Sequence, residues 1–180
     1  MMTENFGNPS SLHRAGLDAQ LAVDKARKII ASALGADSSN IIFTSGATES
    51  SNLAIRGACA AYGRKRRKIV ASSVEHASVD ETLTAMEKSG FEIVRISPRE
   101  DGKFYPADFL AVCDENTVMI TMMYVNNEMG AVEPIEEIAK IIKEKKAVNA
   151  FICTNSCNTS FIVFKIDFLL VFTSLSRFSK

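Results

Sequence analysis

The chain has 180 residues, of which 47% are hydrophobic, so it can bury one globular core. Its 21 basic residues balance 21 acidic ones, and this neutrality gives no reason to expect a nucleic acid or an anionic membrane as a partner. Four cysteines without the spacing of a small secreted domain indicate free thiols, and with only two histidines no metal site is predicted.

The N-terminal segment reads MMTENFGNPSS. It lacks the basic region and apolar core of a secretory signal, so we expect a cytoplasmic protein. Hydrophobic residues then recur at helical intervals from Ser10 to Leu34. Ser10 or Ser11 is the expected N-cap of this helix, and Gly35 is the expected stop signal.

Short apolar runs alternate with helical patterns along the next hundred residues. The predicted strands are Ile41–Thr44, Lys68–Ser72, Phe91–Ser97 and Val118–Val125. The first predicted helix follows the strand Ile41–Thr44 and continues to about Tyr62, and the others are Val79–Ser89, Pro106–Cys113 and Pro134–Lys145. The last strand is almost continuously apolar, as expected when helices cover both faces of a sheet. This alternation predicts an α/β layered domain with a mostly parallel sheet.

The turn after the first strand reads Ser45-Gly46-Ala47-Thr48. Small residues let backbone N–H groups approach a ligand, and the helix that follows directs its positive end toward the same place. The pattern indicates an anion site, most plausibly for phosphate. The alternative is an ordinary strand-to-helix turn in which Ser and Thr only cap the helix.

Polar residues follow two further strands directly. Glu75 and His76 come after Lys68–Ser72, and the Asn-Asn-Glu sequence 126–128 comes after the last strand. Carboxyl ends of parallel strands share one edge of a sheet, where ligands bind. Backbone amides, an imidazole and an amide at one edge would suit a flat, phosphorylated heteroaromatic ligand.

Other features have structural interpretations. Cys59 lies within a predicted helix and Cys113 ends another, so both are expected to be structural thiols. The basic sequence GRKRRK, residues 63–68, is expected to be a solvated loop. The apolar run Phe161–Phe172 is shorter than a membrane span and contains two charged residues.

Four sequence blocks occur in a fixed order between Phe6 and Lys146: FGNPSSLHRAG, IIFTSGATESSNLAIRG, EHASV and VNNEMGAVEPIEEIAKI. They resemble the signature blocks of the cysteine desulfurases, pyridoxal-phosphate enzymes of aminotransferase class V. The resemblance implies that Ala47 and Thr48 bind the cofactor phosphate and that His76 stacks on the pyridine ring. It also implies that Asn127 lies near the phenolic oxygen of the cofactor and the substrate.

At the level of the whole chain, the resemblance implies a fold-type-I large domain over residues 1–146 and a homo- or hetero-dimer with active sites at the interface. The family pattern has a first strand ahead of the ENFGNPSS block, where this chain begins. Residues 147–180 are expected to be a divergent or aberrant segment.

The family pattern continues with an Asp-x-x-Gln block, a Ser-x-His-Lys block whose lysine binds the cofactor covalently, and a loop with the sulfur-accepting cysteine. Aligning TNSCN with the first block puts Asn155 in place of the aspartate and Asn158 in place of the glutamine. A neutral asparagine cannot supply the charge that keeps the pyridine nitrogen protonated. No lysine has the Ser-x-His context, so no catalytic residue is assigned.

Complete enzymes of this family would convert L-cysteine to L-alanine and an enzyme persulfide, for iron-sulfur cluster or thio-cofactor synthesis, with a scaffold protein as a possible sulfur acceptor. We expect the present chain to be inactive alone. The alternatives are a binding or regulatory partner of a full-length desulfurase and a non-functional truncated product. A dinucleotide-binding domain is a weaker alternative, because it would need a glycine fingerprint that the sequence lacks.

Overall fold

The structure, a computed structural model, describes residues 6–126, 128, 130–145, 148, 150–154, 160–165 and 168–174. It divides into two compact units, Met1–Ile41 and Ile42–Lys180. The boundary expected near residue 146 falls outside the described residues and stays a prediction.

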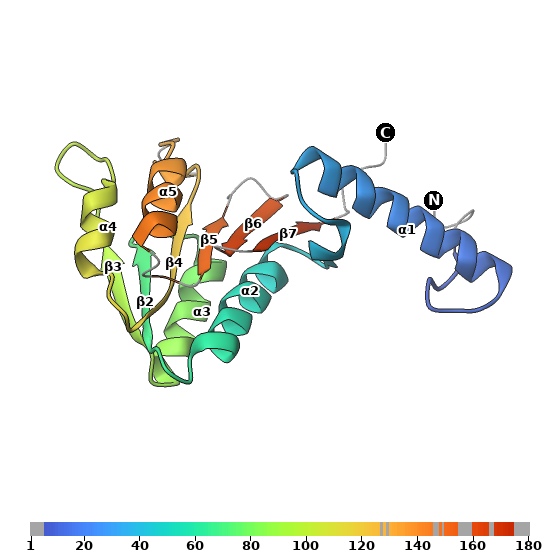
Figure 1. The fold of residues 1–180 in the computed structure, drawn as a ribbon, viewed down its shortest axis with the longest axis horizontal. Helices are drawn as coiled ribbons and strands as arrows, with labels where there is room; N and C mark the ends of the chain where they lie inside the picture. The colour runs from blue at the N-terminus through green and yellow to red at the C-terminus, as the bar shows by residue number, and fades with distance from the viewer. Residues whose placement is uncertain are drawn as a thin grey trace. The chain divides into compact units, whose positions relative to one another are not determined.

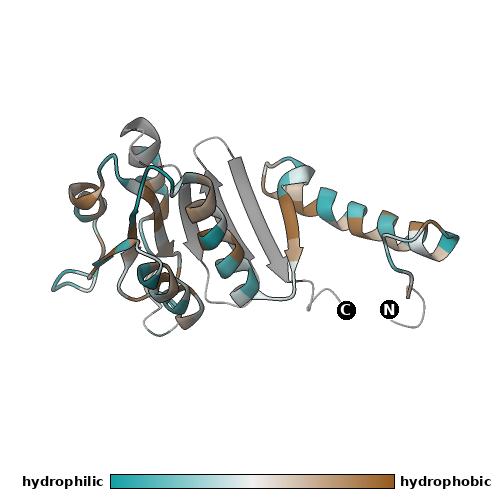
Figure 2. Ribbon diagram, turned by 90° about the horizontal axis from the view of Figure 1, so that it is seen from below, coloured by the Kyte–Doolittle hydropathy of each residue, from teal (hydrophilic) through white to brown (hydrophobic). Residues whose placement is uncertain are grey.

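The first unit consists of helix α1 (Arg14–Ala33) and a short 3-10 helix (Ser38–Asn40). Hydrophobic and hydrophilic residues both occur along α1 (Figure 2). The stop at Gly35 is confirmed, since this glycine has φ +62°, a conformation that favours glycine.

The N-cap expected at Ser10 or Ser11 is wrong. Asn8 holds both serines in a turn, accepting from Ser10 N through its side chain at 3.0 Å and from Ser11 N through its carbonyl at 2.9 Å. The helix therefore begins later, at Arg14. His13 is the N-cap, and its Nδ1 accepts a hydrogen bond from Gly16 N at 3.1 Å.

The second unit alternates strands and helices, and its first eight strands and helices agree with the predicted elements within two residues. They are β1 (Ile41–Thr44), α2 (Ala47–Tyr62), β2 (Lys68–Ser72), α3 (Ala77–Lys88), β3 (Glu92–Ile96), α4 (Pro106–Val112), β4 (Thr117–Met123), α5 (Ile135–Lys145), β5 (Ala150–Thr154), β6 (Ser160–Lys165) and β7 (Phe168–Ser174).

The strands form one sheet in the order β1-β7-β6-β5-β4-β2-β3. Strands β3, β2, β4 and β5 are mutually parallel, which confirms the predicted α/β class. The sequence pattern predicted no strand for β5, β6 or β7; of these, β6 and β7 add an antiparallel hairpin beside β5.

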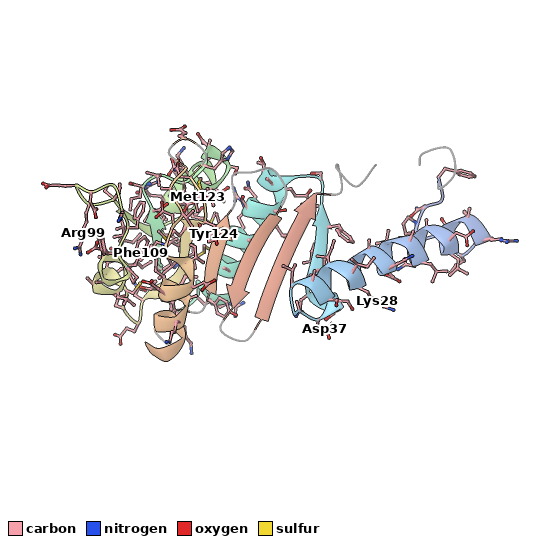
Figure 3. The ribbon with its side chains drawn as sticks, turned by 90° about the horizontal axis from the view of Figure 1, so that it is seen from above. Lys28, Asp37, Arg99, Phe109, Met123 and Tyr124 are labelled. Atoms are coloured by element: carbon pink, nitrogen blue, oxygen red, sulfur yellow. The ribbon has the colours of Figure 1, made fainter. Side chains whose placement is uncertain are left out.

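Two apolar cores lie on opposite faces of β2 and β4. Helices α2 and α3 cover one face, where Ile55 and Leu83 pack on Ile69. Helices α4 and α5 cover the other, where Phe109 and Ile138 pack on Val70 (Figures 1 and 3). All seven residues of β4 are buried, as its continuously apolar sequence predicts.

The connections place the starts of α2 and α3 toward one edge of the sheet. Helix α3 starts directly after β2, hence at the carboxyl edge. Five residues, 63–67, join α2 to β2, so α2 ends near the amino edge and begins about 24 Å away along its 16 residues. Ala47 at its start packs against the cluster that contains Ala71 and Val79.

No helix among the described residues is long and apolar enough to span a membrane.

Candidate cofactor site

The turn between β1 and α2 is held by hydrogen bonds from both sides. Thr44 Oγ1 donates to Gly46 O at 3.1 Å and contacts the buried Ser50 Oγ at 2.6 Å. On the solvent side, Glu49 Oε2 accepts from Ser45 N at 2.7 Å and from Ser45 Oγ at 2.6 Å. These bonds to Ser45 hold the pKa of the Glu49 carboxyl below its usual value.

The N–H groups that open α2 remain available for a ligand. Gly46 is the N-cap and provides no side-chain cap, and the first N–H groups of a helix have no intrahelical acceptor. Ala47 is half-buried and Thr48 is exposed. An anion placed here would accept from these N–H groups and benefit from the positive end of the helix.

His76 caps the next helix and is itself exposed. Its Nδ1 accepts from Ser78 N at 3.1 Å and lies 2.9 Å from Ser78 Oγ. Since Nδ1 accepts from a backbone N–H, the ring proton of neutral His76 belongs on Nε2. The cap orients the ring and leaves it open to a ligand.

The segment after β4 is tied to the segment after β2. Asn126 is buried, and its Nδ2 donates to Val74 O at 3.3 Å. Its Oδ1 accepts from Glu128 N at 2.9 Å. The structure thus brings together two of the predicted polar clusters. In each of them it reveals a structural role that the sequence pattern missed: Ser78 orients His76, and Asn126 holds the loop.

The remaining predicted site residues are Asn127, Asn155 and Asn158. They lie outside the described residues, so their roles stay predictions. Ser72 Oγ donates to Glu75 Oε1 at 2.8 Å, which places the Glu75 carboxylate beside the end of β2.

Glu133 is a buried carboxylate that the sequence analysis did not single out. It is 5% exposed, and its Oε1 has no hydrogen-bond partner among the described residues. Burial raises the pKa of this carboxyl. Its backbone N donates to Tyr124 O at 2.9 Å and closes the loop that carries Asn126. The sequence feature that could have indicated this buried carboxylate is a glutamate inside the otherwise apolar sequence AVEPI.

The residues present fit a phosphorylated ring compound such as pyridoxal phosphate. The first turn of α2 offers N–H groups without intrahelical acceptors, and His76 offers an exposed ring at the start of the adjacent helix. The fold and this arrangement are those expected of a pyridoxal-phosphate-dependent protein of fold type I.

Comparison with known proteins supports this protein class. The family profile "Aminotransferase class-V" matches residues 1–159, and the chain belongs to this family, whose members use pyridoxal phosphate. It is 45% identical over 143 residues to the cysteine desulfurase IscS of Dictyoglomus turgidum, and 44% identical over 144 residues to that of Mannheimia succiniciproducens. These matches cover 79% of this chain and 36% of each relative.

Solved structures show the same likeness. A NifS-like protein superposes with a TM-score of 0.78 at 32% identity, over 83% of this chain and 41% of that protein. DndA from Streptomyces lividans superposes with a TM-score of 0.73 at 31% identity, over 85% of this chain and 49% of that protein. The chain therefore spans less than half the length of these four relatives.

Proposed function

We propose that this chain is the cofactor-binding portion of a cysteine desulfurase and that it binds pyridoxal phosphate reversibly. The observation that carries the proposal is the pairing of open N–H groups at the start of α2 with the exposed ring of His76. The family membership supports this choice of ligand.

Each residue would have a defined task. The N–H groups at Ala47 and Thr48 would bind the phosphate, and the Thr48 hydroxyl would donate to it. The ring of His76, oriented by Ser78, would stack on the pyridine. Asn126 would hold the loop after β4 through its bonds to Val74 O and Glu128 N.

When bound, pyridoxal phosphate supplies an electron sink for negative charge at the α-carbon of an amino acid. In the proposed whole reaction, L-cysteine gives L-alanine and a persulfide. The present 180 residues contain no Ser-x-His-Lys sequence. We propose that the chain alone therefore does not release sulfur from L-cysteine.

Several other expectations remain proposals: a homo- or hetero-dimer, a scaffold protein as sulfur acceptor, iron-sulfur cluster assembly and a cytoplasmic location. A complex between this chain and a full-length desulfurase also remains a proposal. Co-purification with such an enzyme would support it.

The test is a titration of the purified chain with pyridoxal phosphate, followed by absorption and dialysis, in the wild type and in His76→Asn. Asparagine is a good N-cap, so the substitution removes the ring and keeps the cap of α3. We expect the affinity to fall about threefold to tenfold, the range for a lost ring stacking interaction.

His13→Asn is the matched control, because His13 also caps a helix through Nδ1. This variant should bind as the wild type does. Equal affinity in His76→Asn and the wild type would contradict the proposed role of His76, and no saturable binding at all would overturn the proposed function.

A further inference from the structure

A cavity open to solvent lies at the other end of α2, near the amino edge of the sheet. Its volume is about 340 Å³, within the range of small-molecule sites. The end of α2, the loop after it, the end of α3 and the start of the β3 segment form its walls. Its lining on this side runs from Arg56 to Gly63, about 12 to 22 Å along the helix from Thr48.

Three arginines line this cavity, namely Arg56, Arg64 and Arg67, and none of its nine lining residues is acidic. Arg56 donates from Nε to Asn52 Oδ1 at 3.1 Å. The guanidinium of Arg67 stacks over the Phe91 ring, 5.0 Å from its centroid. The Arg64 side chain is exposed and makes no hydrogen bond or ion pair with another described residue.

The remaining wall is apolar. Cys59 and Met86 are each 6% exposed, and Phe91 is 9% exposed. Gly63 allows Phe91 to approach the chain, because a Cβ at this position would lie 2.7 Å from the ring. Burial raises the pKa of the Cys59 thiol to about 11, against the opposite effect of the guanidinium groups of Arg56 and Arg67. The thiol is therefore a neutral part of the wall at physiological pH.

The three arginines could also be present only to compensate the partial charges of the helix ends, and the test must distinguish this explanation from ligand binding. The ends of α2 and α3 carry partial negative charge, which attracts cations. However, three full positive charges exceed two partial charges of about one half each. The surplus favours an anion, and guanidinium groups bind phosphate with matched geometry.

We propose that this cavity binds a small organic phosphate, with its phosphate at Arg56, Arg64 and Arg67 and its apolar part against Cys59, Met86 and Phe91. The site is separate from the pyridoxal phosphate site proposed above. Its ligand combines an anionic group with a ring or other apolar body.

The experiment titrates the full chain with AMP, adenosine and inorganic phosphate and follows backbone amide resonances by NMR. We expect AMP to cause saturable shifts at Gly63, Arg64 and Ser89. Adenosine lacks the charge and should cause none. Inorganic phosphate lacks the apolar body and should bind at least about tenfold more weakly than AMP.

Arg64→Glu and Lys65→Glu form a matched pair. Both residues are exposed in the same loop and both substitutions change the charge equally, but only Arg64 lines the cavity. The AMP affinity should fall about tenfold or more in Arg64→Glu, as expected for loss of a charged hydrogen bond. It should fall less than about threefold in Lys65→Glu.

Three results would overturn the proposal. They are the absence of AMP-induced shifts at the cavity, an equal loss of affinity in the two variants, and equal affinity for inorganic phosphate and AMP. Shifts confined to Gly46 and Thr48 would likewise refute the second site, while agreeing with phosphate binding at the start of α2. The two proposals therefore fail separately.

Discussion

At the scale of single residues, Glu133 is a buried carboxylate in unfavourable surroundings. It is buried, one carboxylate oxygen has no partner among the described residues, and burial raises its pKa. A raised folded-state pKa means that the folded chain holds the proton more tightly than the unfolded chain. The contribution of Glu133 to stability is therefore fully present below the unfolded value near 4.5 and is lost as the pH rises through the folded pKa.

Glu133→Gln removes this titration while keeping the shape of the side chain. We expect the variant to exceed the wild type by about 1 kcal/mol in free energy of unfolding at pH 7.5. The difference should shrink or reverse at pH 4.5, as measured by urea denaturation at both pH values. Glu137→Gln, at an exposed position on α5, should show no such change. A pH-independent effect of Glu133→Gln would contradict the assignment.

At the scale of elements, the turn between β1 and α2 depends on the contact between Thr44 Oγ1 and Ser50 Oγ. Ser50→Ala removes this contact inside the protein and should cost about 1 kcal/mol of stability. Because the turn presents the N–H groups of α2, pyridoxal phosphate affinity should also fall. Thermal unfolding and the same titration measure both effects.

Ser51→Ala provides the comparison for that prediction. Ser51 is also buried, but its Oγ donates to Ala47 O within the helix, and alanine favours helix. Its substitution should leave cofactor affinity unchanged. If both variants bind the cofactor equally well, the turn does not depend on Ser50.

The elements also show which structural features a sequence pattern reveals. Strand β2 and the turn at Gly46 follow from local sequence, because apolar runs and small residues act over a few positions. The start of α1 was wrong, because Asn8 competes for the backbone of both serines. Strands β6 and β7 were missed, because an antiparallel hairpin added to a parallel sheet has no connecting helix and therefore does not show the alternation of helix and strand patterns.

In the candidate site, too, local sequence indicates single residues but not the contacts between distant segments. His76 stood out because it directly follows an apolar strand. The bond from Asn126 to Val74 joins segments 52 residues apart, and no local pattern contains such a contact. The same holds for the cavity at Arg64, since Phe91 reaches it from the position just before β3.

At the scale of the whole molecule, the positions of the lysines bear on how the proposed site would hold its cofactor. The turns 45–49, 73–78 and 124–133 contain no lysine, whereas Lys68 begins β2 and Lys88 ends α3, both toward the amino edge. Lys68 is also paired with Asp114. These three turns therefore supply no amine of their own to bind pyridoxal phosphate covalently.

Borohydride reduction of the chain with pyridoxal phosphate, followed by peptide mapping, tests this arrangement. We expect low, scattered labelling of exposed lysines, with the same pattern in His76→Asn, because reversible binding at α2 brings no amine to the aldehyde. The chain should also release no sulfide from L-cysteine. A stoichiometric adduct on one lysine, lost in His76→Asn, would show that a lysine outside these turns reaches the site. Sulfide release from L-cysteine by the chain would overturn the proposal of inactivity.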